Sequence, residues 1–410
     1  MEEKILEITP HVKWIGALDP GLQVFDVVMT TEYGSTYNAY FIDAEKKTLI
    51  ETVKNTHTDA YLARIKSLCN PADIAYIVLD HTEPDHSGSL SKLLDIAPNA
   101  TVVGTGQAIA YLSDIMNHRF RSIKVRDGDT IELGNKTLRF IGAPNLHWPD
   151  SMYSYLVEDK VLFTCDSFGA HYCFEPVFDD LITQQDDYRE AFDSYFDCIL
   201  RPYSSFMLKA IEKIRPLDIR VVCPGHGPVL RSTWKEIVNR SEERAQKYME
   251  IVENKTNKIL ICYVSAYGYT RLMATWIAQG IKQNSDFEVE LMDIEFASLG
   301  DMEAAVTRSD ALIVGSPTIN KNTLLPIYKL FAAINPLRDK DKAAAAFGSY
   351  GWSGEAADII EANLLGLKLK IVQKAVKNKF SPDKEKAQQL VEFGKSFTEQ
   401  MQKEKIPVAR

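Results

Sequence analysis

From Lys258 to the end of the chain, apolar runs typical of β-strands alternate strictly with helical patterns. The strand-like runs are KILICYV, VELMDI, ALIVGS, AAAAFGS and LKIVQ, and the helical patterns begin near Thr270, Asp301, Leu325, Gly354 and Asp383. Parallel strands need a long crossover, usually a helix, and five βα units of this length are typical of an open sheet covered on both faces. The alternation therefore predicts a doubly wound parallel sheet.

The residues before about 230 follow a different pattern, in which many short β-type runs lie between a few helical segments. One such run is VFDVVMT at residues 24–30, and helical patterns cover residues 61–69, 106–116 and 189–214. This mixture predicts an α and β domain with much antiparallel pairing. A long polar helix over residues 232–253, followed by the charged KTNK, is the predicted linker, so we expect domains at residues 1–255 and 256–410.

Charge and composition argue against several classes of partner. The 410 residues include 47 basic and 56 acidic side chains, a net charge of −9, without a Lys/Arg-rich run to neutralise a phosphate backbone. We therefore expect no nucleic-acid partner. No run approaches the ~18 to 20 apolar residues of a membrane span, and the first residues lack a secretory leader pattern, so we expect a cytoplasmic protein without membrane attachment. Six scattered cysteines without a C-x-x-C pair predict reduced thiols.

A dense cluster of metal-ligand residue types follows the apolar run IAYIVLD. His81, Glu83, Asp85 and His86 bring two imidazoles and two carboxylates into six residues. Alternate side chains of a turn after a strand can face one concavity, so His81 and Glu83 can serve one metal while Asp85 and His86 serve a neighbour. A solvated polar loop is the alternative for any one of these residues, but four ligand types at this spacing favour a metal.

Three later strand-like runs each end on one further ligand type. His147 follows LRFIGAP, Asp166 follows KVLFTC, and His226 lies in PGHG after IRVVC. Each of these residues alone is more typical of a capping or hydrogen-bonded side chain. Together with residues 81–86 they make four histidines and three carboxylates, which fit two metals bridged by one carboxylate with open positions for substrate.

The pattern H-x-E-x-D-H, followed by a lone His, a lone Asp and G-H-G, resembles the metallo-β-lactamase fold. That resemblance implies an αββα sandwich with a dinuclear site at one edge of its two sheets. Hydrolytic members of the fold normally carry histidine where this chain has Glu83, and most of them are zinc enzymes. The swap adds an anionic oxygen donor to a carboxylate-rich site, which favours iron in redox chemistry over zinc.

Three loops of the second half carry the residue types of a flavin site. The first lies between KILICYV and a helix, and a turn with hydroxyls and a glycine at a helix N-terminus attracts a phosphate. The other two follow ALIVG and AAAAFG, at strand ends where ligands of open α/β sheets bind. The candidate cofactor-binding residues are Ser265, Tyr267, Gly268, Tyr269, Thr270, Pro317, Thr318, Ile319, Asn320, Ser349, Tyr350, Gly351, Trp352 and Gly354.

The second half resembles flavodoxin over its whole length. The resemblance implies that the first loop holds the phosphate of FMN and that the other two flank its isoalloxazine ring. Flavodoxins favour Thr or Ser where this chain has Tyr267, so backbone N–H groups must supply more of the phosphate contacts. The alternative interpretations are a core aromatic for Trp352 and a plain turn for Gly351.

A metallo-β-lactamase-like half carrying Glu83, joined to a flavodoxin-like half, resembles the flavodiiron proteins, also called A-type flavoproteins, over essentially all 410 residues. The most specific segments are GSTYNAY at residues 34–40, the motif at His81, LHWPDSM at residues 146–152 and GSPTIN at residues 315–320. The resemblance implies reduction of dioxygen to water, of nitric oxide to nitrous oxide, or both, at a non-haem diiron centre that receives electrons from FMN.

The same resemblance implies a role for each site residue. One iron is expected on His81, Glu83 and His147, the other on Asp85, His86 and His226, with Asp166 bridging the two. His171 is expected near the irons as a proton donor or hydrogen-bond partner, and a histidine in a surface loop is the alternative.

The family further implies a head-to-tail homodimer or homotetramer, in which the flavin of one chain lies beside the irons of its partner. Rubredoxin or another reduced donor is expected to supply electrons, since the chain has no C-x-x-C pair. The competing prediction is a zinc-dependent hydrolase with an accessory flavodoxin-like domain, against which Glu83 argues. A non-enzymatic electron carrier or sensor with a degenerate metal site is the third alternative, against which the complete set of seven ligands argues.

Overall fold

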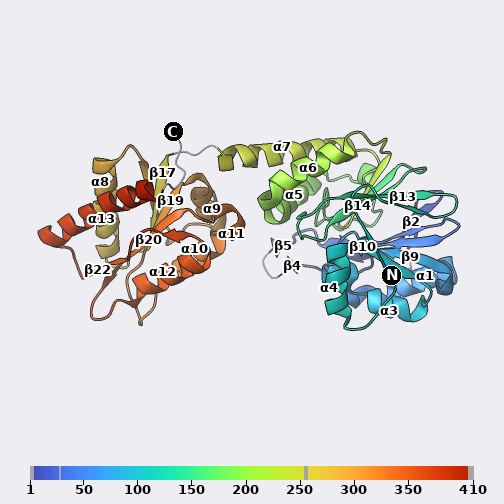
Figure 1. The fold of residues 1–410 in the computed structure, drawn as a ribbon, viewed down its shortest axis with the longest axis horizontal. Helices are drawn as coiled ribbons and strands as arrows, with labels where there is room; N and C mark the ends of the chain where they lie inside the picture. Colours follow the sequence, from blue (N-terminus) through green and yellow to red (C-terminus); the bar gives the residue numbers. More distant parts are fainter. Residues whose placement is uncertain (1–3, 27–28, 254–256, 405–410) are drawn as a thin grey trace. The chain divides into compact units, whose positions relative to one another are not determined.

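The chain divides into two compact units, residues 1–248 and 249–410, in a computed structural model that describes residues 4–26, 29–253 and 257–404 (Figure 1). The predicted helix over residues 232–253 corresponds to α7 (Trp234–Glu253). The predicted domain boundary after residue 255, in the KTNK segment, lies outside the described residues. Over the described ranges, no helix is both long and apolar enough to cross a membrane.

The first unit is built on two β-sheets. One has the order β1-β2-β7-β8-β9-β10-β11, with bounds Leu6–Thr9, Val12–Trp14, Tyr40–Ile42, Lys47–Ile50, Ile74–Val78, Thr101–Thr105 and Ser122–Val125. The other has the order β12-β13-β14-β15-β16, with bounds Thr130–Glu132, Thr137–Gly142, Met152–Leu156, Val161–Cys165 and Val221–Pro224. Trp14, Tyr40 and Val78 of the first sheet share one buried apolar cluster with Phe140 and Phe163 of the second, so the sheets pack face to face.

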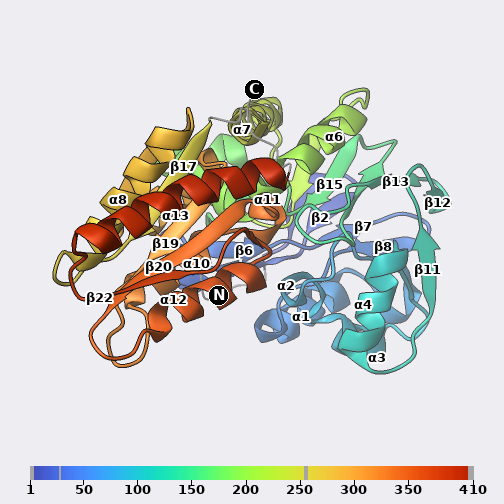
Figure 2. The same cartoon turned by 60° about the vertical axis from the view of Figure 1, so that its left-hand side comes forward.

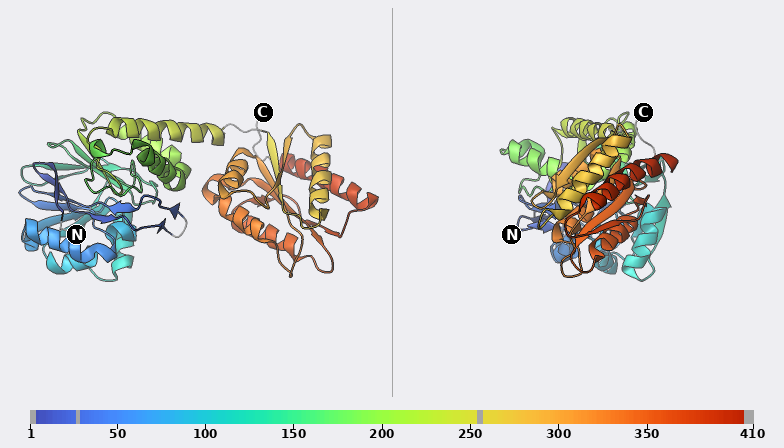
Figure 3. Two further views of the ribbon diagram at one scale, coloured as in Figure 1. Left: turned by 180° about the vertical axis from the view of Figure 1, so that it is seen from behind. Right: turned by 90° about the vertical axis from the view of Figure 1, so that its left-hand side faces the viewer.

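Helices cover the outer face of each sheet (Figure 3). They are α1 (Thr58–Leu68), α3 (Leu90–Ile96), α4 (Gly106–Met116), α5 (Gln185–Tyr195) and α6 (Ser204–Ile214). Ile77 of β9 belongs to the cluster that holds Tyr61 and Leu112 of these helices, whereas its neighbour Val78 belongs to the cluster between the sheets. Successive strand residues thus face opposite layers. The predicted αββα sandwich is confirmed.

Two predicted elements of this unit are wrong in detail. The run at residues 24–30 is two short strands, β4 (Val24–Phe25) and β5 (Met29–Thr30), which pair antiparallel because Asp26 adopts a positive φ of 49° and turns the chain. The predicted helix over residues 189–214 is interrupted between α5 and α6 by a π-helical segment (Phe196–Leu200) and a 3₁₀ turn (Arg201–Tyr203). Pro202 lies in that turn, and a proline has no N–H to continue an α-helix.

The second unit has the predicted doubly wound parallel sheet. Its strand order is β18-β17-β19-β20-β21, with bounds Glu288–Asp293, Lys258–Tyr263, Ala311–Gly315, Ala343–Tyr350 and Lys370–Ile371. The predicted fifth strand, LKIVQ, is shorter than expected, and a separate strand β22 (Val376–Lys379) also pairs with β20. The strand order reverses direction between β17 and β19, which is the point where open α/β sheets bind ligands.

Helices cover both faces of this sheet (Figure 2). On one face α8 (Tyr269–Asn284) and α13 (Lys384–Lys403) pack together, and on the other lie α9 (Leu299–Arg308), α10 (Leu325–Ala333) and α12 (Glu355–Gly366). Gly280 of α8 lies against the backbone of Val391, and Gly394 of α13 lies against the backbone of Ile277, where a Cβ atom would clash. The two glycines therefore let these helices approach closely.

Candidate functional site

Four strand ends at one edge of the first unit carry the predicted metal-ligand residues. After β9 the chain passes through His81 and Glu83 into the helical turn α2 (Pro84–Ser87), which begins with a proline and contains Asp85 and His86. β13, β15 and β16 run in one direction, since β14 is antiparallel to both β13 and β15, and β16 is parallel to β15. The residues that follow these three strands therefore meet at one edge of the sheet, and they include His147, Asp166 and His226.

The first group of donor atoms comes from His81, Glu83, His147 and Asp166, whose ligand atoms all lie within 4.8 Å of one another. The Nε2 atoms of His147 and His81 lie 3.0 Å and 3.2 Å from Glu83 Oε2. Asp166 Oδ2 lies 3.3 Å from His147 Nε2. Four donors with two imidazoles and two carboxylates thus converge on one point.

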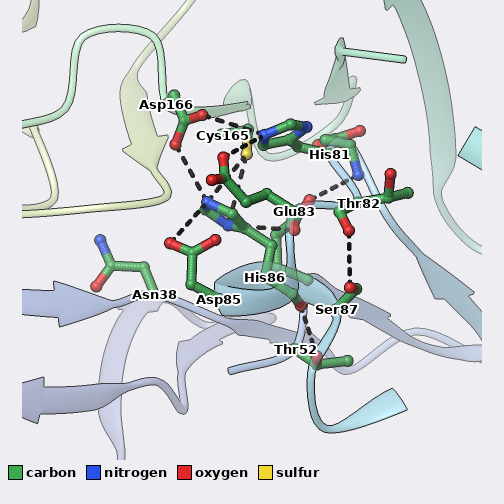
Figure 4. A network of polar contacts seen from close by, with 12 residues as sticks. Asn38, Thr52, His81, Thr82, Glu83, Asp85, His86, Ser87, Cys165 and Asp166 are labelled. Carbon is green, nitrogen blue, oxygen red and sulfur yellow. Dashed lines mark hydrogen bonds and ion pairs between the residues drawn. The ribbon is translucent and has the colours of Figure 1, made fainter. Parts of the chain in front are cut away.

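The second group comes from Asp85, His86 and His226. Figure 4 shows Asp85 and His86 of this group beside Asp166. Asp85 Oδ2 lies 3.1 Å from His226 Nε2, and Asp166 Oδ1 lies 3.1 Å from His86 Nε2. Asp166 therefore presents Oδ2 to the first group and Oδ1 to the second. A carboxylate placed in this way can bridge two cations.

The donor atoms fit a pair of metal ions. All four imidazoles turn Nε2 toward the carboxylates of the cluster. Asp85 Oδ1 is buried and has no hydrogen-bond partner among the described residues, whereas Asp85 Oδ2 and Asp166 Oδ2 face imidazoles of the cluster. Several buried carboxylates this close together are costly, and cations between them and the imidazoles remove that cost. Imidazole and carboxylate donors together suit first-row metals such as iron.

The electrostatics of the cluster favour positive charge. Burial alone would lower the pKa of His81, but its hydrogen bonds to Asp150 and Glu83 outweigh burial and raise that pKa to about 10. Burial likewise opposes a charged His147, yet hydrogen bonds to Asp166 and Glu83 raise its pKa to about 9. Burial would raise the pKa of Glu83, but His147 and His81 lower it. Protons or metal ions can supply the positive charge that these carboxylates attract.

Two further buried carboxylates lie beside the ligand histidines and were not predicted as site residues. Asp150 Oδ2 lies 3.3 Å from His81 Nδ1. Glu51, directly after β8, places Oε2 3.5 Å from His86 Nδ1, and burial raises the pKa of this enclosed glutamate. Glu51 follows β8, whose four residues KTLI include only two apolar side chains, so the local sequence does not predict this strand as IAYIVLD predicts β9.

His171 is buried next to the second group, with only 4% of its surface exposed, so its interpretation as a surface-loop histidine is wrong. Its Nδ1 lies 2.7 Å from Ser35 Oγ, and its ring centre lies 5.1 Å from that of His226. Burial lowers the pKa of His171 well below its usual value, and His226 lowers it further. The ring is therefore neutral at pH 7.

The three candidate flavin loops follow β17, β19 and β20, which are neighbours in the second unit's sheet. Ser349 links them, because its Oγ lies 2.8 Å from Thr270 Oγ1 and its carbonyl oxygen accepts a hydrogen bond of 2.8 Å from the Thr318 N–H. Gly268 begins α8 with a φ of +83°, a left-handed conformation that favours glycine. The other predicted residues of these loops, Ser265, Tyr269, Pro317, Ile319, Asn320, Tyr350, Gly351 and Gly354, lie on the same three segments.

Two aromatic side chains stand out from these loops. Tyr267 is 83% exposed and Trp352 is 85% exposed, so the interpretation of Trp352 as a core aromatic is wrong. Exposed rings beside a helix N-terminus fit a ligand that has both a planar aromatic system and a phosphate, because the rings can stack while the helix dipole attracts the anion. FMN has both features.

Comparisons with known proteins match both units. Residues 36–227 match the family described as ODP family beta lactamase, and residues 261–394 match the flavodoxin family. A flavo-diiron protein of Clostridium acetobutylicum is 39% identical, with 96% of this chain and 98% of the relative aligned. An anaerobic nitric oxide reductase flavorubredoxin of Vibrio vulnificus is 35% identical, with 95% of this chain and 79% of the relative aligned.

A solved structure has the same two-unit architecture. The rubredoxin oxygen:oxidoreductase of Desulfovibrio gigas superposes with a TM-score of 0.67 at 29% identity, covering 98% of this chain and 100% of the other. The alignment covers both units of this chain in the same order, and few residues of either chain remain unaligned. On this evidence the chain belongs to the flavo-diiron protein family, as its motifs predicted.

Proposed function

We propose that this chain is an oxidoreductase that reduces dioxygen to water, nitric oxide to nitrous oxide, or both, with electrons that pass through FMN. The proposal depends on the placement of Asp166, which offers one carboxylate oxygen to each of the two groups of metal donors. A shared carboxylate holds two metals close enough to act on one small molecule. Two relatives, one named a nitric oxide reductase and the other an oxygen oxidoreductase, agree with both substrates.

The seven donors divide between the two metals. His81, Glu83 and His147 would hold one iron, Asp85, His86 and His226 would hold the other, and Asp166, which faces both groups, would be shared between them. When bound, the iron pair supplies electrons to the gas molecule, and FMN restores them. The competing prediction is a zinc-dependent hydrolase. Zinc cannot change its oxidation state, so it cannot supply electrons to the gas molecule.

The side chains around the centre control access to it. Glu83 and His147 keep 12% and 16% of their side chains exposed, whereas the other five ligands keep 7% or less. The open side of the centre therefore lies at Glu83 and His147, and substrate enters there. The neutral His171 makes a hydrogen bond with Ser35 and packs against His226 of the second group.

The flavin lies in the second unit. The first loop, with Ser265, Tyr267, Gly268 and Thr270, would hold the phosphate at the start of α8, and the other two loops, one of which carries the exposed Trp352, would flank the ring system. The hydrogen bonds through Ser349 fix the three loops against one another before the cofactor binds, which lowers the ordering cost of binding.

We also propose an electron donor, an oligomeric state and a cellular compartment for this chain. Rubredoxin or another reduced protein or cofactor supplies the electrons; the Desulfovibrio gigas relative, a rubredoxin oxygen:oxidoreductase, has rubredoxin in its name. The active form is a head-to-tail homodimer or homotetramer. No disulfide joins any of the six cysteines, all of which lie in the described ranges, and this is the state expected in a reducing cytoplasm, where we place the protein.

The test is turnover by the reduced enzyme. Anaerobic protein with a reducing system is mixed with O2 or with NO, and gas consumption is recorded with electrodes. Consumption of either gas supports the proposal, and the ratio of the two rates assigns the substrate. Consumption of neither by a protein that contains iron and FMN would contradict it.

A further inference from the structure

Three of the four imidazoles of the metal cluster are oriented in the same way. In His81, His86 and His226 the Nε2 atom faces cluster carboxylates, whereas Nδ1 faces a different oxygen outside the seven donors. For His226 that oxygen is the backbone carbonyl of Thr36, 2.6 Å away. A carbonyl only accepts, so His226 carries a proton on Nδ1, and a neutral or metal-bound ring then has its lone pair on Nε2.

For His81 the outer oxygen belongs to Asp150, which is fully buried. The Nδ1–Oδ2 distance is 3.3 Å. The same Oδ2 accepts hydrogen bonds of 2.8 Å from both the N–H and the hydroxyl of Thr82. The aspartate is thus held rigidly, and its position is set by the residue that follows His81 in the chain.

For His86 the outer oxygen belongs to Glu51, which is 2% exposed. Oε1 accepts a 2.6 Å hydrogen bond from the Asp80 N–H, and this bond aims Oε2 at His86 Nδ1, 3.5 Å away. Oε2 has no hydrogen-bond partner among the described residues. Cys165 Sγ lies 3.6 Å from the same nitrogen, but sulfur is a weak acceptor, so the carboxylate is the stronger partner.

We propose that Asp150 and Glu51 are positioning residues, one for each metal of the proposed centre, which hold His81 and His86 with the proton on Nδ1 and the Nε2 lone pair toward the metal. The inference rests on the proposed function, because it takes the two donor groups to be metal sites. His81 belongs to the first group and His86 to the second, so each carboxylate supports a different metal.

The physical reason is that a histidine binds a metal only through an unprotonated nitrogen. A carboxylate at Nδ1 fixes the tautomer and the ring plane, and it also makes Nε2 a stronger donor. Loss of such a partner typically weakens metal binding by about 10- to 100-fold. Because the partners are separate, the two metals should respond to different substitutions.

The first experiment uses the full-length wild-type chain loaded with Zn²⁺, a diamagnetic probe for both sites. Long-range ¹H–¹⁵N NMR of the histidine rings shows which nitrogen is protonated and which binds the metal. We expect protonated Nδ1 and metal-bound Nε2 for His81 and His86, with His226 as the internal reference. A proton on Nε2, or zinc on Nδ1, in either ring would overturn the inference without any variant.

The second experiment measures Zn²⁺ affinity in the variants Asp150→Ala and Glu51→Ala, with Asp150→Asn and Glu51→Gln as the conservative forms. The ring signals of His147 and His226 report the first and the second metal separately. We expect Asp150→Ala to weaken only the first by about 10- to 100-fold and Glu51→Ala only the second, with partial recovery in the amide forms, which keep one neutral acceptor.

The control is Asp159→Asn, which alters a buried carboxylate of the same unit that pairs with Lys136 and Thr9 instead. It should change neither zinc affinity. If either alanine variant weakens both metals equally, or neither, the positioning roles are wrong while the metal centre stands. If the wild-type chain fails to bind two Zn²⁺ ions, the proposed function fails instead.

Discussion

His171 is not one of the seven proposed metal ligands, and a substitution tests whether it contributes to turnover. In His171→Asn the hydrogen bond to Ser35 and the packing on His226 are lost or weakened, but no proposed ligand is removed. We expect unchanged iron content and turnover that falls by about tenfold, the equivalent of one hydrogen bond. Unchanged turnover, measured beside elemental analysis of the same sample, would remove His171 from the account.

The raised pKa values of His81 and His147 predict how pH affects the metal-free chain. Their folded pKa values of about 10 and about 9 lie above the ~6.5 of an unfolded histidine. Protonation of these rings therefore stabilises the fold fully below about pH 6.5, and this contribution is lost as pH rises through 9 to 10.

Urea denaturation of the metal-free chain at pH 6, 8 and 10 measures this effect. The free energy of unfolding should fall across the series, whereas the metal-loaded chain should lose much less, because metal ions replace the protons. A metal-free chain that becomes more stable from pH 6 to pH 10 would show that the carboxylates do not dominate the cluster's electrostatics.

The sequence singles out the seven candidate ligands that the structure brings together, but it does not single out the two buried carboxylates beside their histidines. His81, Glu83, Asp85 and His86 are recognisable because ligand types crowd into one turn. Glu51 is a single carboxylate after a short strand, and its approach to His86 depends on the pairing of β8 with β9, which no local pattern encodes. Asp150 lies in a recognised motif, but its contact with His81 is likewise a tertiary one.

Among the elements, the start of α8 supports a specific prediction. Gly268 has a φ of +83° and open space where a Cβ would lie, so Gly268→Ala is strained by conformation and not by a clash. The left-handed conformation costs a non-glycine residue about 1 kcal/mol, which is roughly a fivefold change in an equilibrium constant. We expect FMN affinity, measured by quenching of flavin fluorescence, to fall by about that factor.

Gly366→Ala is the matched control, since this glycine at the end of α12 also has open space for a Cβ but no positive φ. It should leave FMN affinity unchanged. Equal effects of the two substitutions would show that the conformation of the first loop does not matter for the flavin.

The elements themselves were predicted where their pattern is long and regular. Strict alternation identifies the parallel sheet of the second unit, and α4 has the predicted bounds. The predicted helix at residues 189–214 is wrong because apolar spacing continues across Pro202 while the backbone cannot. The single strand predicted at residues 24–30 is wrong because Asp26 adopts a positive φ inside this apolar stretch, and the strands on either side of it pair with each other.

For the whole molecule, the proposed head-to-tail assembly predicts complementation between two inactive variants. Asp166→Asn removes the charged bridge between the donor groups, and Tyr267→Glu places an anion in the exposed phosphate loop, where it repels FMN. If flavin and irons work across chains, a mixed dimer keeps one intact pair. Random mixing should then restore about a quarter of wild-type turnover per chain.

The two chains are unfolded, mixed, refolded with iron and FMN, and assayed for gas consumption. Each variant treated alone is the control and should stay inactive. A mixture that is as inactive as the separate variants would mean that each chain uses its own flavin, and sedimentation of an active monomer would contradict the assembly outright.

The metal and flavin content of one purified sample tests directly whether the chain binds two irons and FMN. Elemental analysis gives the metal content, and the visible spectrum of the released cofactor identifies the flavin. The account predicts two irons, held by the donor groups that share Asp166, and one FMN per chain. Zinc without flavin, in protein from iron-replete cells, would contradict it and indicate a hydrolase.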